Sequence, residues 1–126
     1  FGIVGDPDSE GGSVDGVIAG SADEDWYQYR GEDWWDGVAR PTVDFDEGAV
    51  RVCMYVECLE EPSATDARCD GDATPSTHSS GLNGCCSDAG FEVDIGCEGW
   101  SDDTMVYIKV FTELGSCEPY TLDYHY

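Results

Sequence analysis

The sequence predicts an all-β fold: an antiparallel β-sandwich of about seven to eight strands, held together by disulfide bonds. Three observations lead to this prediction. The segment Val50–Leu59 alternates strictly between two faces. Several other short segments of strand character are separated by turns rich in Gly, Pro and Asp, and no segment shows a helical period. The chain also has 7 cysteines in 126 residues, the length of one ordinary domain.

The segment Val50–Leu59 reads VRVCMYVECL, and its alternation is typical of a half-buried strand. One face carries Val50, Val52, Met54, Val56 and Cys58, and the other carries Arg51, Cys53, Tyr55, Glu57 and Leu59. Because cysteines occur on both faces, we expect this strand to be packed on one side and stapled by a disulfide on the other.

Six further segments are expected to be strands, because aromatic and β-branched residues are enriched in them. They are Gly16–Ala22, Asp25–Arg30, Thr42–Phe45, Phe91–Ile95, Met105–Phe111 and Tyr120–Tyr126. Between them, Glu60–Gly90 reads as a long polar loop that its cysteines would tie down. The terminal Tyr126 is in phase with the other aromatic residues of its segment, so we expect the C-terminus to be part of the core.

Residues 1–15 are interpreted as an N-terminal arm and linker, and residues 16–126 as the sandwich domain. The chain begins at Phe1 rather than Met, so we expect that a secretion signal has been removed. The apolar residues Phe1, Ile3 and Val4 open the arm and precede an acidic, Gly-rich spacer. Such an arm can pair with its own sheet, which is the default expectation, or with an edge strand of another copy.

The cysteines favour disulfides over a metal site. Cys53 and Cys58 are five residues apart, so they point to opposite faces of one strand and cannot share a metal ion, and the chain has no Cys-x-x-Cys pair. Disulfides in turn predict an oxidising, extracellular setting. Because the number is odd, at least one thiol is free or joined to another chain. The candidates are Cys53, Cys58, Cys69, Cys85, Cys86, Cys97 and Cys117.

The connectivity of these cysteines is not readable from the sequence. The neighbours Cys85 and Cys86 are expected to bond to two different partners, because a ring between adjacent residues is strained. A bond between Cys58 and Cys69 is a plausible local closure, because only the loop Glu60–Arg68 lies between them.

The charge argues against two classes of partner. The net charge is −23, from 28 acidic and 5 basic residues. Such a surface repels phosphate backbones and anionic lipid, which argues against nucleic-acid binding and membrane adsorption. It is compatible with divalent cations, with cationic partners, or with a solvated surface in salty water. No stretch approaches the roughly 20 apolar residues of a membrane-spanning helix.

Catalysis is poorly supported by the sequence. His78 lies in a loop with Ser76, Ser79 and Ser80, but no strand–elbow motif surrounds these serines. His125 alternates with tyrosines that are expected in the core. Nothing marks the cleft that paired carboxylates would need for glycoside cleavage. We therefore expect that the domain is not an enzyme.

Two other segments could contact sugars. The hydroxyl-rich segment Ala73–Ser80 could carry O-linked glycans at Thr74, Ser76, Thr77, Ser79 and Ser80. The alternative, slightly favoured, is an ordinary polar loop. Trp34 and Trp35 could stack on a sugar or on a partner's aromatic ring, whereas the alternative is that one of them plugs the end of the sandwich.

Three segments resemble the bacterial pre-peptidase C-terminal (PPC) domain family. Gly20–Tyr29, GSADEDWYQY, is similar to the opening pattern of the family, in which a short strand leads to Asp-x-Asp and an aromatic strand. Ser101–Val110 resembles the penultimate strand, and Tyr120–Tyr124 the closing strand. The resemblance extends over roughly residues 15–126. It implies a jelly-roll-like, non-catalytic domain of secreted proteins that sometimes binds calcium and is often attached to hydrolases.

The adjacent pair Cys85–Cys86 and the Tyr-His-Tyr ending resemble a cysteine-rich secreted subset of the family, of the myxobacterial type. That subset has a further cysteine just before the Asp-Pro-Thr that corresponds to Arg40-Pro41-Thr42. The segment Val38-Ala39-Arg40 lacks it. This departure would explain the odd number of cysteines and would leave one of them without a partner.

Calcium is expected as a cofactor, from the acidic turns and mainly from the resemblance. Ca²⁺ takes six to eight oxygen ligands, several of them from carboxylates spaced along a turn. Asp-x-Asp on a strand places both carboxylates on one face, although such pairs also arise by chance among 28 acids. No cluster matches an EF-hand. Candidate clusters are Asp6/Asp8, Asp23/Asp25, Asp44/Asp46 and Asp102/Asp103, with Asp23, Asp25, Asp102 and Asp103 as the preferred ligands.

These observations predict a non-catalytic, secreted structural or adhesive module on the outside of a cell. It would be a self-assembling surface or filament subunit stabilised by calcium and disulfides. Expected partners are copies of itself, another extracellular protein or a glycan, with no nucleic acid and no membrane insertion. The alternative is an accessory domain of a secreted hydrolase that helps export or substrate binding.

Overall fold

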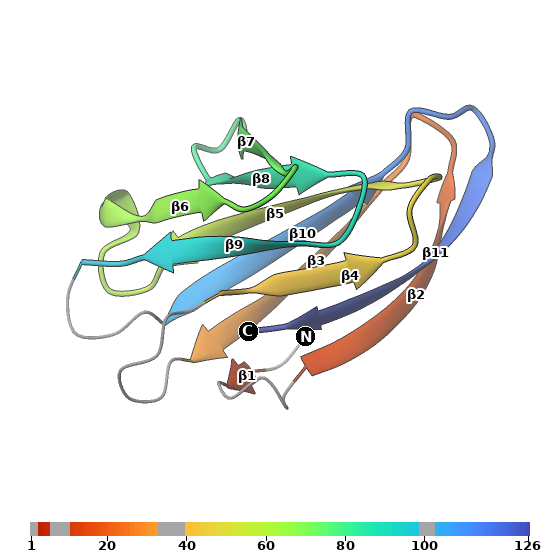
Figure 1. Ribbon diagram of the computed structural model, residues 1–126. Coiled ribbons are helices and arrows are strands. Elements are labelled where there is room, and N and C mark those ends of the chain that lie inside the picture. Colours follow the sequence, from red (N-terminus) through yellow and green to blue (C-terminus); the bar gives the residue numbers. More distant parts are fainter. Residues whose placement is uncertain (1–2, 6–10, 33–39, 99–102) are drawn as a thin grey trace.

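The computed structural model describes residues 3–5, 11–32, 40–98 and 103–126. Two β-sheets face each other, so the predicted antiparallel β-sandwich is confirmed (Figure 1). The strands are β1 (Ile3–Gly5), β2 (Gly11–Ala19), β3 (Glu24–Glu32), β4 (Thr42–Phe45), β5 (Arg51–Cys58), β6 (Asp66–Cys69), β7 (Thr74–Thr77), β8 (Asn83–Ser87), β9 (Phe91–Gly96), β10 (Thr104–Phe111) and β11 (Cys117–His125). One 3₁₀ turn, η1 (Pro62–Ala64), follows β5.

The strand order is that of a jelly roll. The six-stranded sheet has the order β1-β3-β10-β5-β8-β7, and the five-stranded sheet has the order β2-β11-β4-β9-β6. When β2 to β5 and β8 to β11 are counted one to eight in chain order, the two sheets read 2-7-4-5 and 1-8-3-6. Among the described strands, all pairings are antiparallel except that of β1 with β3. Eight strands therefore form the jelly roll, and β1, β6 and β7 are additions at sheet edges.

Two expectations about local structure are wrong. The segment Glu60–Gly90 is not a loop, since it contains β6, β7 and β8. The domain does not begin after residue 15, because β2 starts at Gly11 and pairs along its length with β11. Glycine is normally depleted in strands, but here the missing side chains leave room for tyrosine rings. A Cβ at Gly12 would overlap the ring of Tyr124, and a Cβ at Gly16 would overlap the ring of Tyr120.

The core lies between the inner faces of the sheets. The two faces expected for β5 are confirmed, because Val52, Met54 and Val56 belong to the main core and Cys53 and Tyr55 to a smaller cluster on the outer face. The main core comprises Ile18, Tyr29, Val43, Val50, Val52, Met54, Val56, Cys58, Cys85, Phe91, Val93, Ile95, Val106, Ile108, Val110, Tyr120, Leu122, Tyr124 and Tyr126. The C-terminal Tyr126 is buried and accepts a hydrogen bond from Thr104 at 3.0 Å, as expected for a C-terminus in the core.

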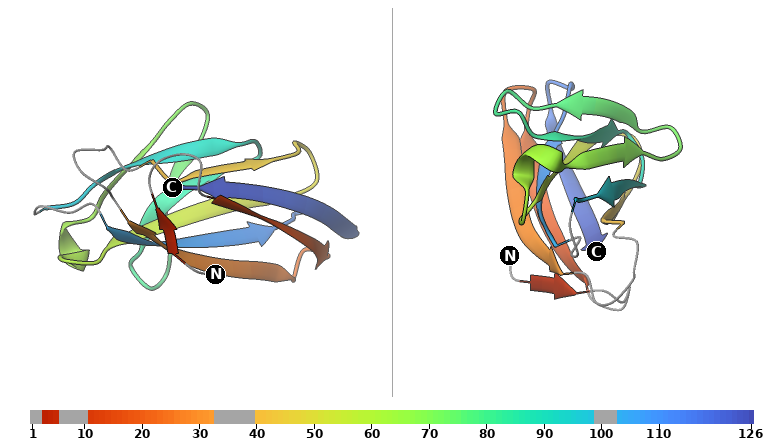
Figure 2. Two further views of the ribbon diagram at one scale, coloured as in Figure 1. Left: turned by 90° about the horizontal axis from the view of Figure 1, so that it is seen from below. Right: turned by 90° about the vertical axis from the view of Figure 1, so that its left-hand side faces the viewer.

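The N-terminal arm pairs with its own sheet, which was the default expectation. β1 lies parallel to the end of β3, with Ile3 opposite Arg30 and Gly5 opposite Glu32 (Figure 2). Phe1 lies outside the described residues.

Two of the three disulfides join the two sheets. Cys58 at the end of β5 is bonded to Cys97 just after β9, and Cys69 on β6 is bonded to Cys85 on β8. The local closure between Cys58 and Cys69 that the sequence made plausible is therefore wrong. Chain proximity misleads here because β6 pairs with β9, which turns Cys69 toward the opposite sheet and β8.

The third disulfide lies within one sheet. Cys53 on β5 is bonded to Cys86, its direct cross-strand neighbour on β8. Adjacent residues of a strand face opposite ways, so Cys85 and Cys86 have different partners, as expected. Cys117 is exposed and not disulfide-bonded. Three disulfides indicate a non-cytoplasmic, oxidising environment. The described residues contain no helix long and apolar enough to cross a membrane.

We predict that the double substitution Cys58→Ala/Cys97→Ala lowers the free energy of unfolding by about 2–4 kcal/mol, because this bond closes a long loop and clamps the two sheets. Urea unfolding at equilibrium measures the change. The matched control is Cys117→Ser, which should change stability by less than about 0.5 kcal/mol because the thiol is exposed and not bonded. Equal effects of the two variants would contradict the assignment of the clamp.

Candidate functional site

The outer face of the six-stranded sheet carries an aromatic cluster, which we call the Trp26 patch: Trp26, Tyr55, His78, Lys109 and Phe111. Lys109 on β10 lies opposite Trp26 on β3. Its ammonium lies 5.6 Å from the Trp26 ring centroid and 5.0 Å from that of Phe111, within range of a cation–π interaction. It also forms an ion pair of 2.7 Å with Glu24. The lysine, which is the only one in the chain, is thus positioned among aromatic rings.

Trp26 is partly exposed, at 39% of its surface. Its ring stacks on Tyr55 at 6.0 Å between centroids and meets the edge of His78 at 5.2 Å. Its indole N–H donates to Glu24, and the hydrogen bonds from Lys109 and Trp26 lower the pKa of that carboxyl. The carboxylate therefore stays charged and orients both partners. An aromatic surface held in this way can stack on a sugar or on a partner's ring.

Trp26 was not predicted as a surface residue; the tryptophans predicted to contact a sugar or partner were Trp34 and Trp35. Those two tryptophans lie outside the described residues. The signal was present in the alternation of β3, which places Trp26 on the face opposite to Tyr27 and Tyr29. Tyr29 is 1% exposed, so its face is the inner one.

A chain of hydroxyl groups joins the two sheets where β2 and β3 form their edges. Tyr120 on β11 donates to Asp25 at 2.6 Å, and its oxygen lies 2.6 Å from that of Tyr27. Burial, and then the hydrogen bonds with Asp25 and Tyr27, raise the pKa of Tyr120 far above its usual value. Tyr120 can reach across because Gly16 on the neighbouring strand has no side chain.

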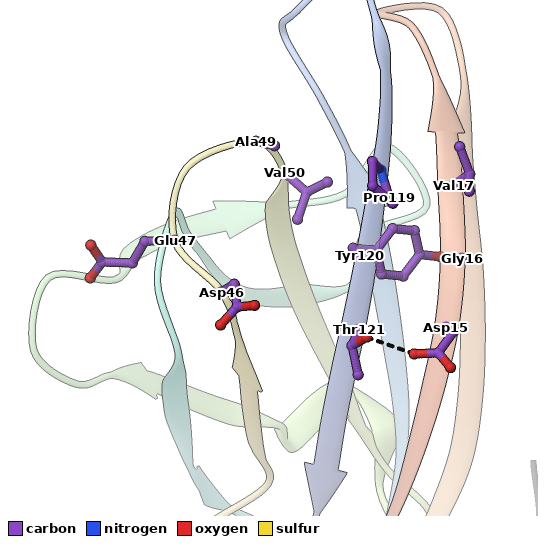
Figure 3. Close-up of a pocket in the computed structure, with 10 residues that line it drawn as sticks. All are labelled: Asp15, Gly16, Val17, Asp46, Glu47, Ala49, Val50, Pro119, Tyr120 and Thr121. Atoms are coloured by element: carbon purple, nitrogen blue, oxygen red, sulfur yellow. Dashed lines mark hydrogen bonds between the residues drawn. The ribbon is translucent and has the colours of Figure 1, made fainter.

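A hollow of about 540 Å³ lies beside this chain, between β2, β11 and the turn before β5 (Figure 3). The picture shows the ring of Tyr120 extending toward Gly16, and Thr121 donating to Asp15. That hydrogen bond is 2.6 Å long. The remaining lining includes the carboxylates of Asp46 and Glu47. The hollow is therefore an acidic recess at the surface.

A second acidic recess lies between strands β4 and β9 of the five-stranded sheet and the turn before β7. Its lining includes Asp44, Asp70, Asp72 and Glu92. Burial, and a hydrogen bond with Asp70, raise the pKa of Glu92. Within the described parts of the chain, no three His, Cys, Asp or Glu side chains are grouped so that they could hold a metal ion.

The four carboxylates preferred for calcium do not form one site. Asp23 accepts a hydrogen bond from the backbone N–H of Ala19, whereas Asp25 accepts from Tyr120. Asp103 pairs with Arg30 at the opposite end of β3. Seven residues of strand, roughly 23 Å, separate the ends of this β3–β10 ladder. Asp102 lies outside the described residues. Asp25 and Asp103 therefore cannot share one cation, and calcium at the separate pairs stays a prediction.

The two histidines are held in different ways. The Nδ1 atom of His78 lies 2.8 Å from the hydroxyl of Ser80, while its ring packs on Trp26 and Tyr55. His125 has a buried Nδ1 without a partner among the described residues. The ring contacts of His78 give it a role in supporting the Trp26 patch.

The predicted glycan acceptors are divided by the structure between a strand and a turn. Thr74, Ser76 and Thr77 lie on the edge strand β7, where Thr74 donates to Cys86 and Thr77 to Asn83. The oxygen of Ser76 lies 3.3 Å from that of Tyr55. Ser79 and Ser80 follow β7 and are exposed. Modification of these residues stays a prediction.

Comparison with protein-family models, curated proteins and solved structures found no match to the chain. The resemblance to PPC domains therefore stays a prediction. Three features of the chain itself bear on its function: the Trp26 patch, the edges of the two sheets, and the disulfides that join the sheets.

We predict that stability falls above pH 10 because of Tyr29 and Tyr120. Burial raises the pKa of each hydroxyl in the folded protein above its usual value near 10. Both contributions are fully present below pH 10 and are lost as the pH rises, since the unfolded state ionises first. The slope should approach about 1.4 kcal/mol per pH unit for each tyrosine.

Urea unfolding between pH 8 and 11 measures this slope. The control is Tyr120→Phe, which removes one ionising group and should reduce the slope by about 1.4 kcal/mol per pH unit. At pH 8 it should lower the free energy of unfolding by about 1–3 kcal/mol, because Asp25 and Tyr27 lose a hydrogen-bonding partner. Identical slopes for the variant and the natural chain would contradict the buried position of this hydroxyl.

Proposed function

We propose that this chain is a non-catalytic, secreted structural or adhesive module that associates with copies of itself outside the cell. Two disulfides clamp the sheets and a third ties β5 to β8, which suits a scaffold exposed to an oxidising environment. The acidic surface keeps such a module soluble.

The observation that carries this proposal is the way in which β1 joins the sheet. It is a three-residue strand whose only partner among the described strands is the end of β3, from Arg30 to Glu32. Strand addition at a sheet edge depends mainly on backbone hydrogen bonds, so β1 of another copy can take the same place. Assembly would then proceed by exchange of arms from one copy to the next.

The experiment is a measurement of native mass under non-reducing conditions for the natural chain and for the variant Ile3→Pro/Val4→Pro. We expect the variant to lose the extended assemblies that arm exchange builds, because proline removes N–H groups that β1 needs for pairing. The control Ile3→Val/Val4→Ile should assemble as the natural chain does.

Two further arms of the same experiment separate other causes. The variant Cys117→Ser should still assemble, because the proposed exchange involves no intermolecular disulfide. Calcium stays a prediction here, and loss of assembly in a chelator would place the cation at joints between copies. A natural chain that remains monomeric at all accessible concentrations would contradict self-assembly.

A second candidate function, an accessory domain that binds the substrate of a secreted hydrolase, is favoured by the exposure of Trp26 among other rings. If it is correct, soluble polysaccharide should quench tryptophan fluorescence in the natural chain. Trp26→Ala should weaken the binding measured by calorimetry about tenfold or more, whereas Trp26→Phe should preserve most of it. No heat of binding to any of a panel of polysaccharides would count against this candidate.

A further inference from the structure

The edge strand β2 carries an inference about the partner of this module. We propose that two copies pair through the free edges of their β2 strands, antiparallel and related by a two-fold axis, so that their five-stranded sheets continue into each other. The interface is separate from the edge that β1 uses. It deepens the proposed function, on which it rests, by naming a surface through which copies associate.

β2 is a long edge with an open backbone. It has nine residues, and its only strand partner among the described residues is β11 (Figures 1 and 2). One side of its backbone is therefore left without a ladder. Such an edge is a ready template for another strand.

Three contacts show which residues present their N–H and C=O groups at this free edge. The carbonyl oxygen of Tyr124 lies beside Gly11, so the backbone groups of Tyr124 point toward β2. Its register partner Gly12 therefore directs its own N–H and C=O groups toward β11. The N–H of Ala19 is taken by Asp23 at 2.8 Å. Val17 lies opposite Pro119, which has no N–H to donate.

These contacts agree, because the direction of backbone groups alternates along a strand. The even-numbered residues of β2 are bonded to β11. The odd-numbered residues Ser13, Asp15 and Val17 therefore direct their N–H and C=O groups away from the sheet. An antiparallel partner strand would use these groups.

The other edges of the sandwich are protected in recognisable ways. β3 is covered at its end by β1 and directs the charged Asp25 inward to Tyr120. β7 has only four residues, one of which is Pro75. β6 also has four residues, and its Arg68 pairs with Asp94 on β9. β2 has no proline, lysine or arginine and is more than twice as long as β6 or β7.

Charge favours a second copy of the chain as the occupant. The net charge of −23 makes two copies repel each other over most of their surface. β2 has a single carboxylate, that of Asp15, which accepts a hydrogen bond from Thr121 and so leans toward β11. Val17 beside it is 55% exposed. An edge strand with one carboxylate is where two like-charged copies meet with less repulsion than elsewhere, whereas a cationic partner would be attracted to the more acidic surface.

The test is the variant Val17→Pro in the full chain, followed by sedimentation or light scattering over a range of concentrations. Proline at this position removes an outward N–H and leaves the bonds to β11 intact, so the monomer keeps its fold. Because of the two-fold symmetry, each pair loses two such N–H groups. We expect pairs of the variant to dissociate at concentrations at least about tenfold higher than pairs of the natural chain. The matched control Val17→Thr keeps the N–H and should remain within about threefold of the natural chain.

Salt separates a second copy from a cationic occupant. Pairing of like-charged copies should strengthen as NaCl is raised from roughly 50 to 500 mM, because screening relieves their repulsion. The inference is overturned if pairing weakens with salt, if Val17→Pro pairs as tightly as Val17→Thr, or if the natural chain does not pair.

The arm variant distinguishes this inference from the proposed arm exchange. Ile3→Pro/Val4→Pro should still form pairs through β2, and those pairs should be lost when Val17→Pro is added. If the arm variant assembles as the natural chain does while Val17→Pro still weakens pairing, arm exchange fails and the β2 interface stands. If the arm variant forms no pairs, the β2 interface fails and arm exchange stands.

Discussion

The structure depends on the two-faced strand β5. Its inner face, with Val52, Met54 and Val56, packs in the core beside β10, and Cys58 at its end clamps the two sheets together through Cys97. Its outer face holds β8 through Cys53 and supports the ring of Trp26 through Tyr55. A slip of one residue would exchange the two faces and break both disulfides. The register of β5 therefore sets that of its neighbours and the position of the surface patch.

The opposite side of the sandwich is closed without covalent bonds. Around the edges of β2 and β3, tyrosines cross the space between the sheets: Tyr120 reaches Asp25 and Tyr27, and Tyr29 stacks on Tyr124 at 5.1 Å. The glycines of β2 leave room for these rings. The chain thus has a disulfide-clamped side and a tyrosine-closed side. The tyrosine-closed side carries the edges at which strands can be added.

Much of the fold could be predicted, whereas little of the candidate site could. Strand β4 lies at its predicted residues, and the two faces of β5 are those expected, because side-chain alternation is a local property. The sequence did not show that the preferred calcium ligands Asp25 and Asp103 lie at opposite ends of one ladder, because this depends on the pairing of β3 with β10. Trp26 was overlooked because an aromatic residue in a strand reads as core until its face is known.

The sequence by itself determined the fold class, the inner and outer faces of the central strands, the burial of the C-terminus and the oxidising environment, because composition and a period of two are written in consecutive residues. The tertiary structure decided the disulfide pairing, the strands β6, β7 and β8 within the segment expected to be a loop, and the exposure of β2. These features depend on which distant segments become neighbours. Segments rich in glycine and polar residues form strands here because a tyrosine ring or a disulfide from a distant segment packs against them. Their own local sequence does not show which distant segment that is.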